Sequence, residues 1–141
     1  MKPAHRPLAF IAVVFLAMAA IVTVSRLRAG NDIIPWRTNF SAAQSESRAS
    51  GKPVFAYFTA DWCGPCQSLK HTTWSDKQVA KTLEQFVPVK IDIDASQDLA
   101  QRYSITAVPT FAILSADGSV VSQSEGALGP DDLIRWIRQR R

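Results

Sequence analysis

The chain of 141 residues has few metal-binding side chains, with only two cysteines and two histidines. A structural zinc site needs about four ligands, most often cysteine thiolates and histidine imidazoles. This sequence offers one Cys-x-x-Cys pair and the isolated His5 and His71, so a zinc site would have to borrow ligands from another chain. The sequence also lacks a methionine-rich or histidine-rich patch, which argues against a copper carrier.

Acidic residues are absent from the first 30 positions, which hold Lys2, Arg6, Arg26 and Arg28. The formal net charge of +4 arises there, because the other 12 of the 16 basic residues are matched by 12 acidic residues. The part of the chain beyond residue 30 is therefore neutral overall. The basic surplus gives no indication of a nucleic-acid partner.

A stretch of 17 residues without charge, Leu8 to Val24, lies between these basic residues. It is at the short end of what crosses a bilayer, and two interpretations are open. One is a signal anchor, and the other is a cleaved signal peptide with Ala17-Met18-Ala19 as its processing site. Apolar residues continue beyond that site, which favours the anchor. We expect residues 1–25 to be the signal anchor or signal peptide, 26–35 a linker and 36–141 a domain outside the cytosol.

The exported part alternates between helical and strand-like segments. One strand is expected at the apolar run 53–60 and another at the alternating run 87–94. Residues 110–123 are expected to form a hairpin with Asp117-Gly118 at its turn. Helices are expected at 39–51, from Cys63 onward, at 76–86, at 96–103 with Ser96 as N-cap, and at 129–141. The alternation implies parallel strand pairing, and the hairpin adds an antiparallel edge. We therefore predict an α/β fold with a mixed central sheet and helices on both faces.

The two cysteines, Cys63 and Cys66, lie where a strand is expected to end and a helix to begin. The first turn of a helix has unpaired N–H groups and a partial positive charge, which stabilise a thiolate and lower its pKa. Pro65 suits that turn because it has no N–H to lose. Gly64-Pro65 is typical of a turn, which disfavours two ordinary core thiols. We predict a redox pair with Cys63 as the exposed nucleophile and Cys66 as the recessed resolving thiol.

The stretch FTADWCGPC, residues 58–66, resembles the active site of thioredoxins, and its last five residues match the thioredoxin motif at every position. Val108-Pro109-Thr110 resembles the cis-proline segment of the same family. The resemblance covers about Trp36 to Arg141 and implies the thioredoxin fold. It also implies that Trp62, Gly64 and Pro65 support the active site, and that Val108 and Pro109 contact the substrate.

Residues 50–79 resemble more particularly the C-terminal domain of periplasmic thiol:disulfide interchange reductases, and also small anchored thioredoxin-like proteins. Two positions depart from these relatives, because Tyr57 stands where they carry a buried acid and Lys70 where the interchange reductases carry a glutamate. Lys90 matches the lysine that pairs with the missing acid. We hypothesise that Cys66 loses its proton to water or Asp61 and that Lys90 favours the thiolate. A snorkelling lysine at a strand end is the alternative for Lys90.

The resemblance implies an extracytoplasmic thiol:disulfide oxidoreductase that needs no metal or organic cofactor. The expected location is the cell inner membrane, with a single pass and the catalytic domain in the periplasm; a soluble periplasmic protein after signal cleavage is the alternative. Expected partners are proteins with disulfides and a membrane electron donor, since a reductant in an oxidising compartment must be recharged. The Gly-Pro dipeptide resembles that of reducing thioredoxins. A disulfide oxidase or isomerase, and a metallochaperone or assembly factor using the two thiols, are the alternatives.

Overall fold

The computed structural model of the chain describes residues 11–20 and 31–140. Residues 11–20 are helical, and Asn31–Arg141 form a separate compact unit. Among the described residues, no helix is both long enough and apolar enough to cross a membrane. The charge-free stretch Leu8 to Val24 continues at both ends into positions outside the described residues.

A mixed four-stranded sheet with the strand order β2-β1-β3-β4 forms the centre of the compact unit. Its strands are β1 (Val54–Thr59), β2 (Val87–Asp92), β3 (Thr110–Leu114) and β4 (Val120–Glu125). Strand β1 pairs parallel with β2 and antiparallel with β3, and β3 pairs antiparallel with β4. The mixed sheet is confirmed, but among the four strands only β1 and β2 pair in parallel. The reason is that β2 ends and β3 begins at the same end of the sheet, so the connection between them does not carry the chain back to the other end.

The helices of the compact unit follow the predicted order, with one short 3-10 helix added. They are α2 (Phe40–Ser50), α3 (Gly64–His71), η1 (Thr73–Ser75), α4 (Lys77–Leu83), α5 (Gln97–Arg102) and α6 (Pro130–Gln139). Helix α2 begins and ends as predicted, because Asn39 Oδ1 accepts a hydrogen bond from Ala42 N and Gly51 adopts a φ of 72°. Ser96 is the N-cap residue of α5 as predicted, although its side chain makes no capping hydrogen bond.

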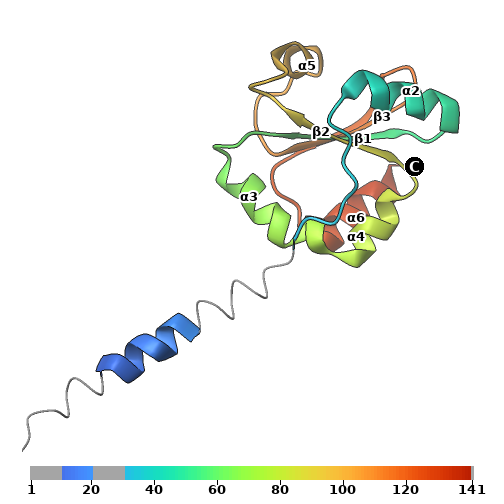
Figure 1. Cartoon of the computed structure of the whole chain (residues 1–141). Helices are drawn as coiled ribbons and strands as arrows, with labels where there is room; N and C mark the ends of the chain where they lie inside the picture. Colours follow the sequence, from blue (N-terminus) through green and yellow to red (C-terminus); the bar gives the residue numbers. More distant parts are fainter. Residues whose placement is uncertain (1–10, 21–30, 141) are drawn as a thin grey trace, which may run out of the picture. The chain divides into compact units, whose positions relative to one another are not determined.

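The helices lie on both faces of the sheet and enclose two cores (Figure 1). Helices α3, η1, α4 and α6 cover one face, and the cysteine-side core lies beneath them; it contains Cys63 and Cys66 together with Phe55, Tyr57, Leu69, Trp74, Val79, Leu83, Phe111, Leu133 and Ile137. Helices α2 and α5 cover the other face. The opposite core beneath them is built from Ala43, Val54, Ala56, Phe58, Val87, Val89, Ile91, Tyr103, Ala112 and Leu114. The predicted alternation in β2 is confirmed by this division.

Residues 31–37 pack against the cysteine-side core before α2 begins. Ile34 is buried, and the ring centroid of Trp36 lies 5.0 Å from that of Trp74. Ile33 N donates a hydrogen bond to Trp74 O at 2.9 Å. Positions 31–35, which the sequence assigns to a linker, therefore contact the folded unit, while positions 26–30 lie outside the described residues.

Candidate active site

Cys63 and Cys66 lie at the junction of β1 and α3. After β1 ends at Thr59, Cys63 N donates a hydrogen bond to Ala60 O at 3.2 Å and so closes a tight turn. Helix α3 then begins at Gly64, with Pro65 in its first turn. A proline there removes no helical hydrogen bond, because the first N–H groups of a helix have no partner within it. The local sequence thus holds both cysteines at the start of α3.

The two cysteines form a disulfide, and their Cα atoms are 5.2 Å apart. Cys63 is the N-cap residue of α3, and its Sγ accepts a hydrogen bond from Cys66 N at 3.2 Å. The sulfur of Cys63 therefore lies at the positive end of the helix dipole and on an N–H donor. Both features stabilise a thiolate at this atom once the disulfide is reduced.

The predicted exposure of Cys63 was wrong for this disulfide state. Cys63 is 3% exposed and Cys66 is 1% exposed. The disulfide bond holds the sulfur of Cys63 against that of Cys66, within the cysteine-side core. Gly64 and Pro65, in contrast, are exposed, and no atom lies within 4 Å of the position that a Cβ on Gly64 would take. A substrate chain can therefore approach over the Gly64-Pro65 turn.

Trp62 stands on the surface directly before Cys63 and is 68% exposed. Its Nε1 donates a hydrogen bond to Asp94 Oδ2 at 2.8 Å. Asp94 N in turn donates to Asp92 Oδ1 at 2.9 Å. The loop after β2 thus holds the indole of the residue that precedes Cys63. Sequence reasoning missed Asp94, because nothing in an acidic stretch indicates which carboxylate reaches a residue 32 positions away.

The Val108–Pro109 peptide bond is cis, as the resemblance implies. Pro109 is buried, and Val108 is half-buried and packs against both cores. Strand β3 starts at Thr110, which pairs with Phe58 near the end of β1. The register therefore places Pro109 at the end of the sheet from which the Cys63 turn emerges.

Tyr57 occupies the position at which the resemblance to thioredoxins implies a buried acid. Its ring centroid lies 4.9 Å from that of Trp74 and 5.7 Å from that of Phe111. Burial raises the pKa of the Tyr57 hydroxyl, so this side chain stays neutral near pH 7. Lys90 is the register partner of Tyr57 in the parallel β1–β2 pair, is half-buried and forms no ion pair with any described residue.

The other polar groups named from the sequence, Asp61 and Lys70, lie on opposite sides of the α3 start in the chain. Asp61 is exposed, and its backbone carbonyl accepts a hydrogen bond from Gln67 Nε2 at 3.1 Å. Lys70 is half-buried in the last turn of α3, at the helix end away from Cys63. Within residues 11–20 and 31–140, no three His, Cys, Asp or Glu side chains come together as a metal site. The chemistry that this site displays is that of the disulfide itself.

A family model described as a thioredoxin-like domain matches residues 40–141. The chain belongs to the thioredoxin-like family. Over 102 residues it is 37% identical to chloroplastic thioredoxin Y2 of Arabidopsis thaliana, which covers 72% of this chain and 59% of that protein. Over 97 residues it is 36% identical to thioredoxin of Chlamydia trachomatis, which covers 69% of this chain and 90% of that protein.

A solved structure extends this likeness at the level of the fold. The C-terminal domain of DsbD from Neisseria meningitidis, in its oxidised form, matches with a TM-score of 0.65 and 24% identity, over 75% of this chain and 99% of that chain. The predicted thioredoxin-like fold is thus confirmed. A disulfide-bonded Cys-x-x-Cys pair within this family supports thiol–disulfide oxidoreductase chemistry.

Proposed function

We propose that this protein is an extracytoplasmic oxidoreductase that reduces protein disulfides by dithiol–disulfide exchange. The observation that carries the proposal is the position of Cys63 Sγ at the start of α3, bonded to Cys66 and on the Cys66 N–H donor. The exposed Trp62 and the open Gly64-Pro65 turn provide room beside it for a substrate chain.

The exchange takes place in two steps that balance in sulfur and electrons. In the reduced protein, the Cys63 thiolate attacks one sulfur of the substrate disulfide, forms a mixed disulfide and releases the first substrate thiolate. The Cys66 thiolate then attacks Cys63 Sγ, regenerates the disulfide described here and releases the second substrate thiolate. Each thiolate that leaves takes up a proton, and two electrons pass from the protein to the substrate.

The surrounding residues support these steps by position. The indole of Trp62, held by Asp94, provides an apolar surface beside the mixed disulfide. Val108 and Pro109, at the same end of the sheet, provide the backbone against which the substrate chain lies. Tyr57 stays neutral, so the proton of Cys66 leaves through water or Asp61, and the charge of Lys90 favours the thiolate.

The same proposal includes a location and a partner. Residues 8–24 serve as a single-pass anchor in the inner membrane, and the folded unit lies in the periplasm. The support is the charge-free stretch that follows a short basic tail. A cleaved signal peptide and a soluble periplasmic protein are the alternative. A membrane electron donor would return electrons to Cys63 and Cys66 after each turnover.

The reduction potential of the Cys63–Cys66 pair tests the direction of transfer. The full chain is equilibrated with glutathione or dithiothreitol redox buffers, and the dithiol fraction is measured after the thiols are alkylated. The Gly64-Pro65 turn leads us to expect a value near the roughly −270 mV of thioredoxin. A value near the roughly −120 mV of a strong oxidant such as DsbA would contradict the reductase and favour a disulfide oxidase.

A further inference from the structure

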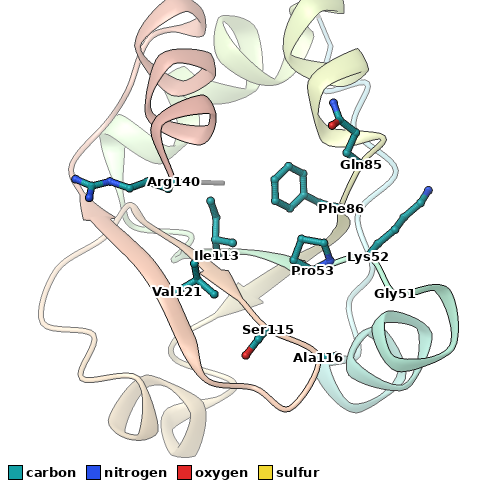
Figure 2. Close-up of a pocket in the computed structure, with 10 residues that line it drawn as sticks. All are labelled: Gly51, Lys52, Pro53, Gln85, Phe86, Ile113, Ser115, Ala116, Val121 and Arg140. Carbon is teal, nitrogen blue, oxygen red and sulfur yellow. The ribbon is translucent and has the colours of Figure 1, made fainter.

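The end of the folded unit opposite the active site contains an apolar pocket that thiol exchange does not use. The pocket has a volume of about 470 Å³ and lies where β1 begins and β3 ends. The larger apolar side chains that line it are Pro53, Phe86, Ile113 and Val121 (Figure 2). The six residues of β1 separate it from the Cys63 turn, which corresponds to about 20 Å of strand. A group bound in this pocket would leave the disulfide free.

Basic side chains flank the mouth of this pocket. Lys52 and Arg140 line it from opposite sides, with their charged ends directed outward (Figure 2), and no acidic residue is among its lining residues. Arg48 adds a third cation, because its Nε donates a hydrogen bond to the carbonyl of the lining residue Ala116 at 3.2 Å.

Acids lie near these cations as well. Asp117 follows this alanine in the hairpin turn, and Lys52 Nζ donates a hydrogen bond to the backbone carbonyl of Glu84 at 2.8 Å. A hydrogen bond from Arg37, together with the charges of Arg37 and Lys52, lowers the pKa of Glu46. The rim therefore combines an apolar floor with cations that come from α2, from the loop after it and from the end of α6.

Exposed apolar side chains continue from the pocket onto the edge of the sheet. Val120 and Val121 are 47% and 54% exposed. They begin β4, the last strand of the sheet order, which pairs with β3 alone. Apolar side chains bordered by Lys and Arg are typical of surfaces that lie at the boundary between lipid headgroups and acyl chains.

The polypeptide enters the folded unit over the cysteine-side face, where Ile33 N bonds to Trp74 O, and it passes close to this end of the sheet. Arg37 forms a parallel bridge with Val89, so the residues before it run back toward the start of β2. Ile33 and Pro35 line a second pocket that shares Lys52 and Phe86 with the first. Six positions, 25–30, separate this entry from the charge-free stretch, and a fully extended chain of that length spans at most about 20 Å.

We propose that this end of the domain docks on a bilayer that carries anionic headgroups. The docking surface consists of Pro53, Phe86, Ile113, Val120 and Val121 with the rim cations Lys52 and Arg140. The inference rests on the membrane anchor of the proposed function, which would keep this surface within reach of the bilayer. The valines enter the interfacial layer, and the cations pair with lipid phosphates. Docking of this kind turns the Cys63–Cys66 pair away from the membrane and toward soluble substrates.

Hydrogen exchange on the full chain in lipid nanodiscs tests this surface. One set of discs contains phosphatidylcholine alone, and the other contains about one third phosphatidylglycerol. Each basic residue near an anionic surface contributes about a fivefold preference for it, so residues 113–121 should exchange several-fold more slowly in the anionic discs. Residues 60–66 around the disulfide should exchange equally in both.

Charge reversals give matched controls for this test. Lys52→Glu and Arg140→Glu should each remove most of the protection of residues 113–121. Lys77→Glu makes the same change of charge at an exposed position outside the docking surface and should leave the protection intact. Equal exchange in both lipids, or protection that survives Arg140→Glu, would overturn the proposal.

Loss of the anchor is also a distinct outcome. A chain that does not remain with the discs overturns the docking proposal, because the surface would then have no bilayer within reach. Reduction of a disulfide substrate by the same sample tests the thiol chemistry independently. Failure of the docking surface and failure of the reductase are therefore distinguishable.

Discussion

The two cores of the sheet differ in the size and the chemistry of their side chains. The cysteine-side core packs large rings against one another, with Trp74 in contact with Trp36, Phe55, Tyr57 and Phe111, and it continues to the disulfide. The opposite core consists largely of alanine, valine, leucine and isoleucine side chains. The cysteine-side core also buries the Trp74 indole Nε1, which lies among these rings beside the Tyr57 side chain. The comparison indicates that one face carries the chemistry, while the other mainly contributes stability.

The largest expected effect is the loss of disulfide reduction when a cysteine of the cysteine-side core is replaced. Cys63→Ser should reduce the rate of disulfide reduction to that of the uncatalysed exchange, because no thiolate remains at the start of α3. Cys66→Ser should instead accumulate a mixed disulfide between Cys63 and the substrate, measurable by intact-mass spectrometry. If Cys63→Ser still reduces the substrate above background, or if it accumulates a mixed disulfide on Cys66, then Cys66 and not Cys63 is the nucleophile.

An acid at position 57 should have the next largest effect. Tyr57→Asp removes a buried ring, which alone costs about 3–5 kcal/mol, and places a carboxyl whose pKa burial would raise. Because the folded state then binds the proton more tightly than the unfolded state, the stability of the variant should fall as pH rises above about 4. Its rate of disulfide reduction should gain a titration in the neutral range.

Tyr57→Phe is the matched control, since it keeps the ring and removes only the hydroxyl. Because burial raises the pKa of Tyr57, this control should follow the wild-type rate profile between pH 5 and pH 9. An unchanged profile for a folded Tyr57→Asp variant would contradict the idea that this position affects the proton of Cys66.

Truncations in the two cores should have similar effects on stability and different effects on the active site. Phe111→Ala should lower the free energy of unfolding by about 3–5 kcal/mol, and Leu114→Ala by about 2–5 kcal/mol, because each leaves a cavity in a buried position. Only Phe111→Ala should also shift the reduction potential, since its ring shares a core with Cys63 and Cys66. Denaturant unfolding measures the free energy of unfolding, and redox-buffer titration measures the reduction potential. If both variants shift the potential equally, the two cores do not differ in their influence on the disulfide.

The sequence predicts the parts of the fold that local pattern determines. The alternation of Val87, Val89 and Ile91 is enough to place β2 over the opposite core. Asn39 and Gly51 bound α2 because capping is a property of a few neighbouring residues. The Cys-x-x-Cys spacing places both sulfurs at the start of α3 for the same reason.

The features that sequence reasoning missed depend on contacts between distant residues. The direction of β3 depends on where the chain re-enters the sheet, and the alternation of helices and strands does not specify that point. The bond between Trp62 and Asp94 depends on the path of a loop. The low exposure of Cys63 depends on the residues that pack around the disulfide in the cysteine-side core, and these come from distant parts of the chain.

The smallest predicted difference concerns the first turns of two helices, one on each face. Asp76 Oδ1 accepts hydrogen bonds from Gln78 N at 2.8 Å and Val79 N at 2.9 Å at the start of α4, so Asp76→Ala should cost about 1 kcal/mol of unfolding free energy at pH 7. Ser96→Ala should cost less than about 0.5 kcal/mol, because the Ser96 side chain caps no N–H of α5. Denaturant titration of both variants under one set of conditions measures the difference. Equal losses would mean that α5 also depends on the side chain of Ser96. A clear difference would mean that α5 is held by the packing at its far end, where the Tyr103 ring lies 5.9 Å from that of Phe58.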